Sequence, residues 1–165
     1  QVIASTVCNW KSNAQIEWHH FGDGPEMKNI TEFTTNHKNA NASIILHGWT
    51  SAEDIYKFYN SHYITWFINV SKYEGVPVSI MEAFSFGVPA IATNAGATSE
   101  IVNNTNGQLI DLEVTNGILE NYILSCFEKD YPAKRLNAQI TWKEKFNAEK
   151  NYTSLTNKLK SLLVL

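Results

Sequence analysis

The sequence predicts an α/β fold: a doubly wound, mostly parallel sheet with helices on both faces. Short segments rich in β-branched and aromatic residues alternate with longer segments of helical character. Four of the expected strands run into loops that carry glycine. The chain has 165 residues, of which 44% are hydrophobic and 18% charged, so it can form one domain with a substantial core. Alternating strands and helices are typical of a parallel sheet that is covered on both faces.

The expected elements follow one another without a repeat or a low-complexity segment. The chain begins in the end of an amphipathic helix over residues 2–11. Ser51, with Asp54 three residues later, resembles a helix cap. Tyr63–Val70 has the composition of a buried strand. The other strands are expected at residues 15–21, 42–46, 89–93 and 108–111, and the other helices at residues 25–37, after residue 77, and at 99–102, 115–129, 132–146 and 148–165.

Composition excludes several classes of function. The net charge of −3 argues against a nucleic-acid surface, which needs a basic excess. Cys8 and Cys126 lack metal-site spacing and lie in apolar helical patterns, so we expect buried thiols in a reducing cytoplasm. No apolar run is long enough for a membrane span, and Gln1 opens no signal-peptide pattern. Peripheral contact with the inner face of the membrane, through other parts of the protein, stays open.

The glycine-containing loops indicate where a ligand would bind. In doubly wound sheets, ligands bind outside the carboxyl ends of the strands. We therefore expect one site at that edge of the sheet, formed by the loops at residues 22–25, 47–49, 71–77 and 94–98.

The segment Ser71–Gly87 carries the clearest chemistry. Pro77 suits the first position of a helix, because its missing N–H would be unpaired there anyway. The N–H groups of Val78, Ser79 and Ile80 would then point outward with the positive end of the helix dipole, where they favour an anion such as phosphate.

Two carboxylates bracket this helix end. Glu74 precedes it and Glu82 lies about one turn inside it. Ionised carboxylates only accept hydrogen bonds, so they suit the hydroxyl groups of a sugar or a ribose. The pattern favours a ligand with a charged middle and a polyol on either side. Either acid alone is better explained by helix stability, which a glutamate near the N-terminus improves, but the combination of two is less common.

Glu-Gly-Val-Pro followed by Glu-Ala, with Glu74 and Glu82 separated by seven residues, resembles the signature of family 4 glycosyltransferases. The later run Phe-Gly-Val-Pro-Ala-Ile-Ala-Thr fits the same pattern. The resemblance implies a retaining enzyme of the GT-B fold, which has two Rossmann-like halves and uses a nucleoside diphosphate sugar. It places this chain in the C-terminal, donor-binding half.

The same resemblance implies roles for individual residues. Glu74 would hold hydroxyls of the transferred sugar and counts as the catalytic residue. Glu82 would accept hydrogen bonds from the ribose diol. The backbone from Gly75 through Val76, Pro77 and Val78 to Ser79 would cradle the sugar and the diphosphate. Where many members have a second glycine, this chain has Pro77, so one N–H donor is lost or moved to Val78.

Two further loops match family positions beside the nucleotide. The resemblance makes Gly22, Asp23 and Gly24 part of a loop that flanks the nucleotide, although alone they are a simple turn before Pro25. His47, Gly48 and Trp49 match a loop near the base. Trp49 could equally be a core anchor. His19 and His20 would point to opposite faces of a strand and cannot form a joint metal site.

The chain departs from the family at its start. The family's donor half opens with a strand and a Gly-Arg-…-Lys segment that neutralises the diphosphate, and nothing similar stands before residue 1. We expect that this strand and the N-terminal, acceptor-binding half belong to the complete protein. Its acceptor would be a sugar or a lipid-linked molecule.

The resulting hypothesis is the donor-binding part of a glycosyltransferase of bacterial glycan or surface polysaccharide synthesis, with no metal and no cofactor besides the donor. A binding module with nucleotide-sugar affinity but no transfer is the alternative. A receiver-like signalling domain is disfavoured, because it needs acids where the strands here end in Gly22, His47, Ser71 and Asn94.

Overall fold

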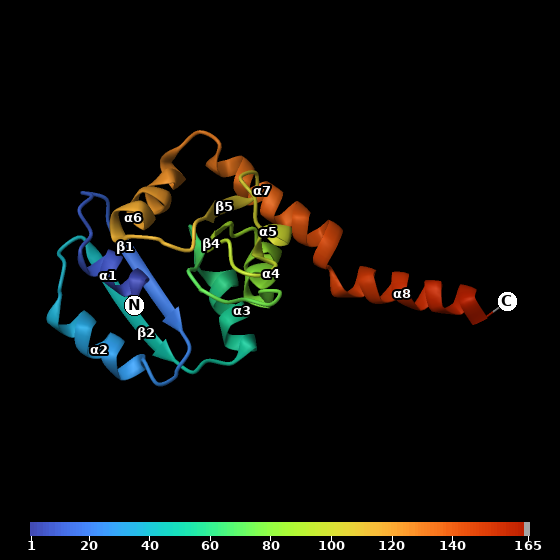
Figure 1. Cartoon of the computed structure of the whole chain (residues 1–165), viewed down its shortest axis with the longest axis horizontal. Helices are drawn as coiled ribbons and strands as arrows, with labels where there is room; N and C mark the ends of the chain where they lie inside the picture. The colour runs from blue at the N-terminus through green and yellow to red at the C-terminus, as the bar shows by residue number, and fades with distance from the viewer. Residues whose placement is uncertain (164–165) are drawn as a thin grey trace.

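The computed structural model describes residues 1–163 (Figure 1). The strands are β1 (Ile16–Phe21), β2 (Ala42–Gly48), β3 (Phe67–Asn69), β4 (Ala90–Thr93) and β5 (Gly107–Ile110). The α-helices are α1 (Val2–Cys8), α2 (Met27–Asn36), α3 (Ala52–Ser61), α4 (Val78–Ser85), α5 (Thr98–Ile101), α6 (Asn116–Leu124), α7 (Tyr131–Thr141) and α8 (Ala148–Leu163). A 3-10 helix, η1 (Ser125–Phe127), follows α6, and a π-helix, η2 (Trp142–Phe146), follows α7. The expected end of the last helix, residues 164–165, lies outside the described residues.

The strands form two parallel groups. β1 pairs with β2, and Ile16 lies opposite Ala42. β4 lies between β3 and β5, with Ala90 opposite both Phe67 and Gly107. All of these pairs are parallel, which confirms the predicted strand direction.

Helices cover both faces of the three-stranded group. Ile91 of β4 packs into a cluster with Trp66 and with Leu119 of α6. Its neighbours Ala90 and Ala92 pack on the other face, in a cluster formed with side chains of α4, α5 and α7. All four β4 residues are buried. A strand that is buried on both faces is the arrangement that the α/β prediction requires.

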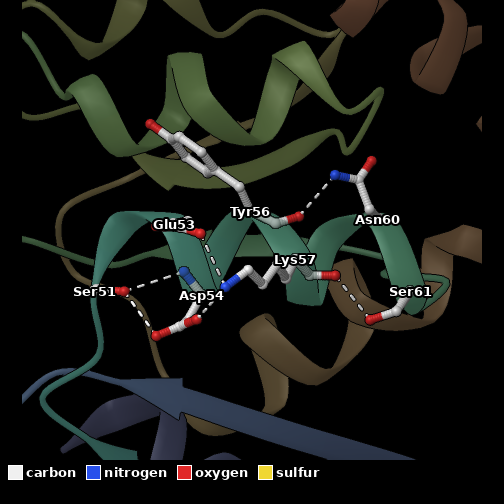
Figure 2. A network of polar contacts seen from close by, with 7 residues as sticks. All are labelled: Ser51, Glu53, Asp54, Tyr56, Lys57, Asn60 and Ser61. Atoms are coloured by element: carbon white, nitrogen blue, oxygen red, sulfur yellow. Dashed lines mark hydrogen bonds and ion pairs between the residues drawn. The ribbon is translucent and has the colours of Figure 1, made fainter.

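Polar contacts fix the ends of several elements. The Ser51 side chain accepts a hydrogen bond from the Asp54 N–H at 3.2 Å, as the sequence predicts for the start of α3 (Figure 2). On the same exposed side, Lys57 pairs with Asp54 at 3.0 Å, a contact that water and salt screen. Glu120 is buried and accepts from the backbone N–H groups of Lys11 and Ser12 at 2.9 Å each, which holds the turn between α1 and β1.

The prediction of a buried strand over residues 63–70 is wrong in extent, because β3 covers three residues and is half-buried. Side chains of helix α7 form hydrogen bonds with the backbone segment that precedes β3. Arg135 donates to the Ile64 carbonyl at 2.6 Å, and the Tyr131 hydroxyl donates to the Thr65 carbonyl at 2.5 Å. The Arg135 guanidinium also lies 4.4 Å from the centre of the exposed Tyr63 ring. The β-branched composition therefore marks a segment held by side chains of α7 as well as a strand.

The C-terminal part also differs from the predicted elements. The expected helix over residues 132–146 changes to a π-helix at Trp142, and α8 then extends away from the rest of the molecule (Figure 1). Neither α8 nor any other helix within residues 1–163 combines the length and apolarity needed to cross a membrane.

Cys8 is a buried free thiol as predicted, whereas the free thiol of Cys126 is half-buried. Burial raises the pKa of both thiols.

Candidate functional site

The loop from Ser71 to Pro77 connects β3 to α4, and contacts with neighbouring strand ends hold it in place. The Asn69 side chain accepts a hydrogen bond from the Ser71 N–H at 3.0 Å. The Thr93 hydroxyl, at the end of β4, donates to the Ser71 carbonyl at 2.5 Å. Further along, the Ala97 N–H donates to the Gly75 carbonyl at 3.1 Å. These contacts confirm that two of the expected loops, residues 71–77 and 94–98, lie side by side at the ends of neighbouring strands.

Gly96 allows the closest approach between these two loops. It has a φ of +53°, a conformation that residues with a Cβ rarely adopt. A Cβ at this position would lie 1.9 Å from the carbonyl oxygen of Glu74. The backbone of Glu74 therefore has its place only because residue 96 lacks a side chain.

Gly96→Ala should displace the Glu74 loop. Avoiding the overlap requires backbone movement, and the left-handed conformation alone costs about 1–2 kcal/mol in a residue with a Cβ. We expect a lower melting temperature and at least about tenfold weaker binding of the predicted nucleotide-sugar ligand, measured on the complete protein.

Gly117→Ala is the matched control. A Cβ at Gly117, in the first turn of α6, meets nothing within 4 Å, so alanine there should not lower the stability of the helix. Ligand binding by Gly96→Ala that equals that of Gly117→Ala would show that the position of the Glu74 loop is not important.

The start of α4 differs from its prediction. Pro77 is the residue before the helix, with φ −71° and ψ 95°, and not its first residue. The N–H of Ile80 is bonded to the Pro77 carbonyl at 3.2 Å, so it is not available to a ligand. Of the three N–H groups expected to be free, only those of Val78 and Ser79 donate to no backbone or side-chain acceptor within residues 1–163. Both residues are exposed, and their N–H groups lie at the positive end of α4.

Glu74 and Glu82 line the same cavity, which has a volume of about 910 Å³. Each carboxylate is held by one neighbour: Asn69 donates to Glu74 Oε1 at 2.8 Å, and the Tyr56 hydroxyl donates to Glu82 Oε1 at 2.6 Å. Ser79, at the start of α4, lines the cavity as well. The structure therefore brings two carboxylates together with the N-terminus of a helix, as the sequence predicts.

The other predicted loops form a second group. The Gly22 N–H donates to the Gly48 carbonyl at 2.8 Å, which joins the Gly22–Gly24 loop to the end of β2. The exposed Asp23 accepts from the Gly24 N–H at 2.7 Å. Helix α3 lies between this second group of loops and the loop that carries Glu74, because Phe58 contacts Phe21 of β1 while Tyr56 contacts Glu82.

His47 and Trp49 have different surroundings. The His47 ring stacks on Phe21 at 4.2 Å, and its Nε2 lies 2.9 Å from Nδ1 of His19. Burial lowers the pKa of His47, and the nearby His19 and His62 lower it further. The ring of His47 is thus in contact with side chains of β1, although the residue is exposed. Trp49 is 79% exposed, so the interpretation as a core anchor is wrong.

Metal-binding side chains are not gathered anywhere in the described part of the chain: within residues 1–163, no three His, Cys, Asp or Glu residues are placed to hold one ion. His19 contacts Phe21 whereas His20 contacts Trp18, in agreement with their predicted separation on the two faces of β1. Asn69 and Tyr56, which donate to the two carboxylates, were not among the predicted site residues. Asn69 ends an apolar strand, where an amide is unusual, but nothing in the sequence marks Tyr56 as a partner of Glu82.

The arrangement suits a ligand that joins hydroxyl groups to an anion. Two N–H donors at the start of α4 favour negative charge. The carboxylates only accept hydrogen bonds, so they favour hydroxyl donors on either side of it. A phosphate placed against either carboxylate would be repelled, which assigns the anion to the helix end and the polyols to Glu74 and Glu82.

The family model described as "Glycosyl transferases group 1" matches residues 2–123. Curated proteins gave no significant match to the sequence.

Solved structures with the same fold include HepE from Anabaena in complex with UDP-glucose, at a TM-score of 0.76 and 20% identity over 97% of this chain. A glycosyltransferase from Rickettsia africae has a TM-score of 0.76 and 22% identity over 98% of this chain. Sucrose-phosphate synthase from Thermosynechococcus elongatus has a TM-score of 0.74 and 16% identity over 99%. The chain spans 44%, 44% and 42% of these three structures, less than half of each. The fold is that of a Rossmann-like domain of GT-B glycosyltransferases, and the chain belongs to the group 1 glycosyltransferase family.

Proposed function

We propose that this domain binds the nucleoside diphosphate sugar of a retaining, family 4 glycosyltransferase, which transfers the sugar to a hydroxyl of an acceptor. The observation that carries the proposal is the placement of Glu74 and Glu82 on one cavity beside the N-terminus of α4. The complexes of HepE with UDP and with UDP-glucose support this class of donor.

Each predicted residue has a role in this proposal. The N–H groups of Val78 and Ser79 bind the diphosphate, and the adjoining backbone of Gly75, Val76 and Pro77 shapes the loop around it. Glu82 accepts from the ribose, and Glu74 accepts from the transferred sugar. The backbone of His47–Trp49 and the Gly22–Gly24 loop surround the base. Charge on the leaving diphosphate is then stabilised by donors that are already in place, which lowers the barrier to transfer.

The acceptor is bound by another part of the complete protein. A sugar or a lipid-linked acceptor in bacterial glycan or surface polysaccharide synthesis fits this division of tasks. Free thiols at Cys8 and Cys126 suit a reducing cytoplasm, with contact to the inner face of the membrane through other segments.

Incubating the complete protein with UDP-, GDP- and ADP-sugars tests transfer directly. Release of nucleoside diphosphate that depends on an added acceptor supports the proposal. Tight binding of a nucleotide sugar without any release, with acceptors and lipid-linked acceptors present, would instead favour a binding module.

Transfer should survive chelation. In this proposal the diphosphate is neutralised by backbone donors and basic side chains, since the described residues offer no cluster for a metal ion. We expect the same rate within about twofold in EDTA. A loss of activity that magnesium or manganese restores would contradict this assignment.

We also propose that an additional parallel strand belongs between β1 and β3. The cavity is lined along both strands, including Ile16, Trp18 and Ile68, and each strand has a hydrogen-bonded neighbour on its other side only, within residues 1–163. Unpaired edges are a template for another strand. An apolar strand there would join the two groups into one sheet, and a parallel direction would bring its carboxyl end to Glu74 and Glu82. Basic residues after such a strand would reach the diphosphate.

This proposal predicts that residues 1–165 alone bind nucleotide poorly and transfer no sugar. The chain then offers the helix N-terminus, worth about 0.3–2 kcal/mol towards an anion, and a cleft open to water. A longer protein that includes the upstream strand should regain nucleotide binding, and amides of β1 and β3 that face the cavity should exchange hydrogen more slowly. Transfer by residues 1–165 alone would show that the two-part organisation is wrong.

A further inference from the structure

Each of the two carboxylates in the site is held through one oxygen by a neutral donor from a neighbouring element. Asn69 Nδ2 donates to Glu74 Oε1 at 2.8 Å, and the Tyr56 hydroxyl donates to Glu82 Oε1 at 2.6 Å. Neither Oε2 atom accepts a hydrogen bond from residues 1–163. Both glutamates are half-buried, and no buried side-chain oxygen in this part of the chain lacks a partner, so each Oε2 is accessible to solvent.

The surroundings of Asn69 fix its amide. Its Oδ1 accepts from the Ser71 N–H at 3.0 Å, so the nitrogen of the same amide is turned toward Glu74. Asn69 is the last residue of β3, where the sheet limits its backbone movement. A rigid strand end therefore sets one oxygen of a carboxylate that lies on a loop.

Tyr56 is 37% exposed, and a neighbouring aromatic ring contacts one side of it. Tyr56 points away from the polar side of α3 that carries Lys57 (Figure 2). Its ring lies 5.7 Å from the Phe86 ring, next to the end of α4. The bond to Glu82 raises the pKa of the Tyr56 hydroxyl, so this hydroxyl stays protonated and donates at neutral pH.

We propose that Asn69 and Tyr56 are positioning residues, which hold Glu74 and Glu82 by one oxygen each and leave the second oxygen for the hydroxyls of the donor. Fixing a side chain before the ligand arrives removes part of the ordering cost of binding. The proposal rests on the proposed function, because it assigns partners to the same two glutamates.

Tyr56→Phe tests the first half. UDP, GDP and ADP are titrated into the complete protein, and the tightest of them is compared with its 2′,3′-dideoxy form. The variant should bind the ribonucleotide about three- to tenfold more weakly and the dideoxynucleotide within about twofold of the unmodified protein. The preference for the ribonucleotide should therefore fall, which a general loss of stability would not produce.

Tyr59→Phe is the matched control. Tyr59 lies on the same helix and stacks on the same Phe86 ring at 4.9 Å, and its hydroxyl makes no hydrogen bond within residues 1–163. The preference of the Tyr59→Phe protein for the ribonucleotide over the dideoxynucleotide should stay unchanged. An unchanged preference in Tyr56→Phe as well would overturn the role of Tyr56.

Asn69→Asp tests the second half. The introduced carboxylate keeps an oxygen for the Ser71 N–H but replaces the amide donor that faces Glu74. We expect kcat for transfer to fall about tenfold or more, while binding of the nucleoside diphosphate stays within about twofold. A kcat within twofold of the unmodified enzyme would overturn the role of Asn69.

Asn103→Asp controls for the added charge. The Asn103 Oδ1 accepts from the Thr105 N–H and hydroxyl at 2.8 and 2.7 Å, and its side-chain Nδ2 donates to no partner within residues 1–163. This variant should keep the original kcat. Failure of the unmodified protein to bind any of the three nucleotides would refute the proposed function itself, whereas normal binding with unaltered variants would refute only the positioning roles.

Discussion

Glu74→Gln should lower the turnover of the complete enzyme by about 10- to 100-fold. A hydrogen bond that involves a charged group contributes on the order of 1.5–3 kcal/mol, and every 1.4 kcal/mol corresponds to a factor of ten. The amide keeps the shape of the side chain but removes the charge that, in the proposed function, accepts from the sugar hydroxyls. The nucleoside diphosphate lacks that sugar, so its affinity should change by less than about threefold.

The comparison between turnover and nucleotide affinity decides what Glu74 does. Steady-state kinetics give the first quantity and calorimetry gives the second. Parallel losses in both would mean that Glu74 holds the loop, whose backbone contacts Gly96 and whose side chain bonds Asn69, and does not hold the sugar.

Glu82→Ala should weaken nucleotide binding by about tenfold or more and leave the fold intact. Glu82 is half-buried on α4, and removal of its carboxylate eliminates the proposed acceptor for the ribose diol, again on the order of 1.5–3 kcal/mol. The measurement is a calorimetric titration with the ribonucleotide, and the melting temperature serves as the check on folding. Equal affinity before and after the substitution would refute the ribose assignment.

The fold could be predicted from the sequence because a strand that is buried on both faces appears as a short apolar run between helical segments. Ala90–Thr93 is apolar and short, lies between helical segments, and forms the buried strand β4. Residues 63–66, which are rich in aromatic and β-branched side chains, were also expected in a strand, but their backbone binds to α7. A neighbouring side chain such as Arg135 accounts for this, because it donates to a backbone carbonyl that a strand would otherwise use. Composition alone does not show whether a segment binds to a neighbouring strand or to side chains of a helix.

The site was predictable to the extent that it is local in sequence. Glu74, Ser79 and Glu82 lie within nine residues, and the loop and helix between them bring all three to one cavity. Tyr56 comes from a different helix, and its contact with Glu82 depends on how α3 packs against α4. The position of Pro77 before the helix could not be predicted either, because proline is compatible with that position and with the first position of the helix. The hydrogen bond from the Ile80 N–H to the Pro77 carbonyl is visible only in the structure.

Donor recognition by this domain can be measured by calorimetric titration of the complete protein with UDP-, GDP- and ADP-sugars, repeated with Glu82→Ala. We expect one-to-one binding of at least one of these donors and about tenfold or greater loss of that affinity in the variant. Absence of binding by all three donors, or binding that Glu82→Ala leaves unchanged, would contradict the assignment of this domain to donor recognition through α4 and its two carboxylates.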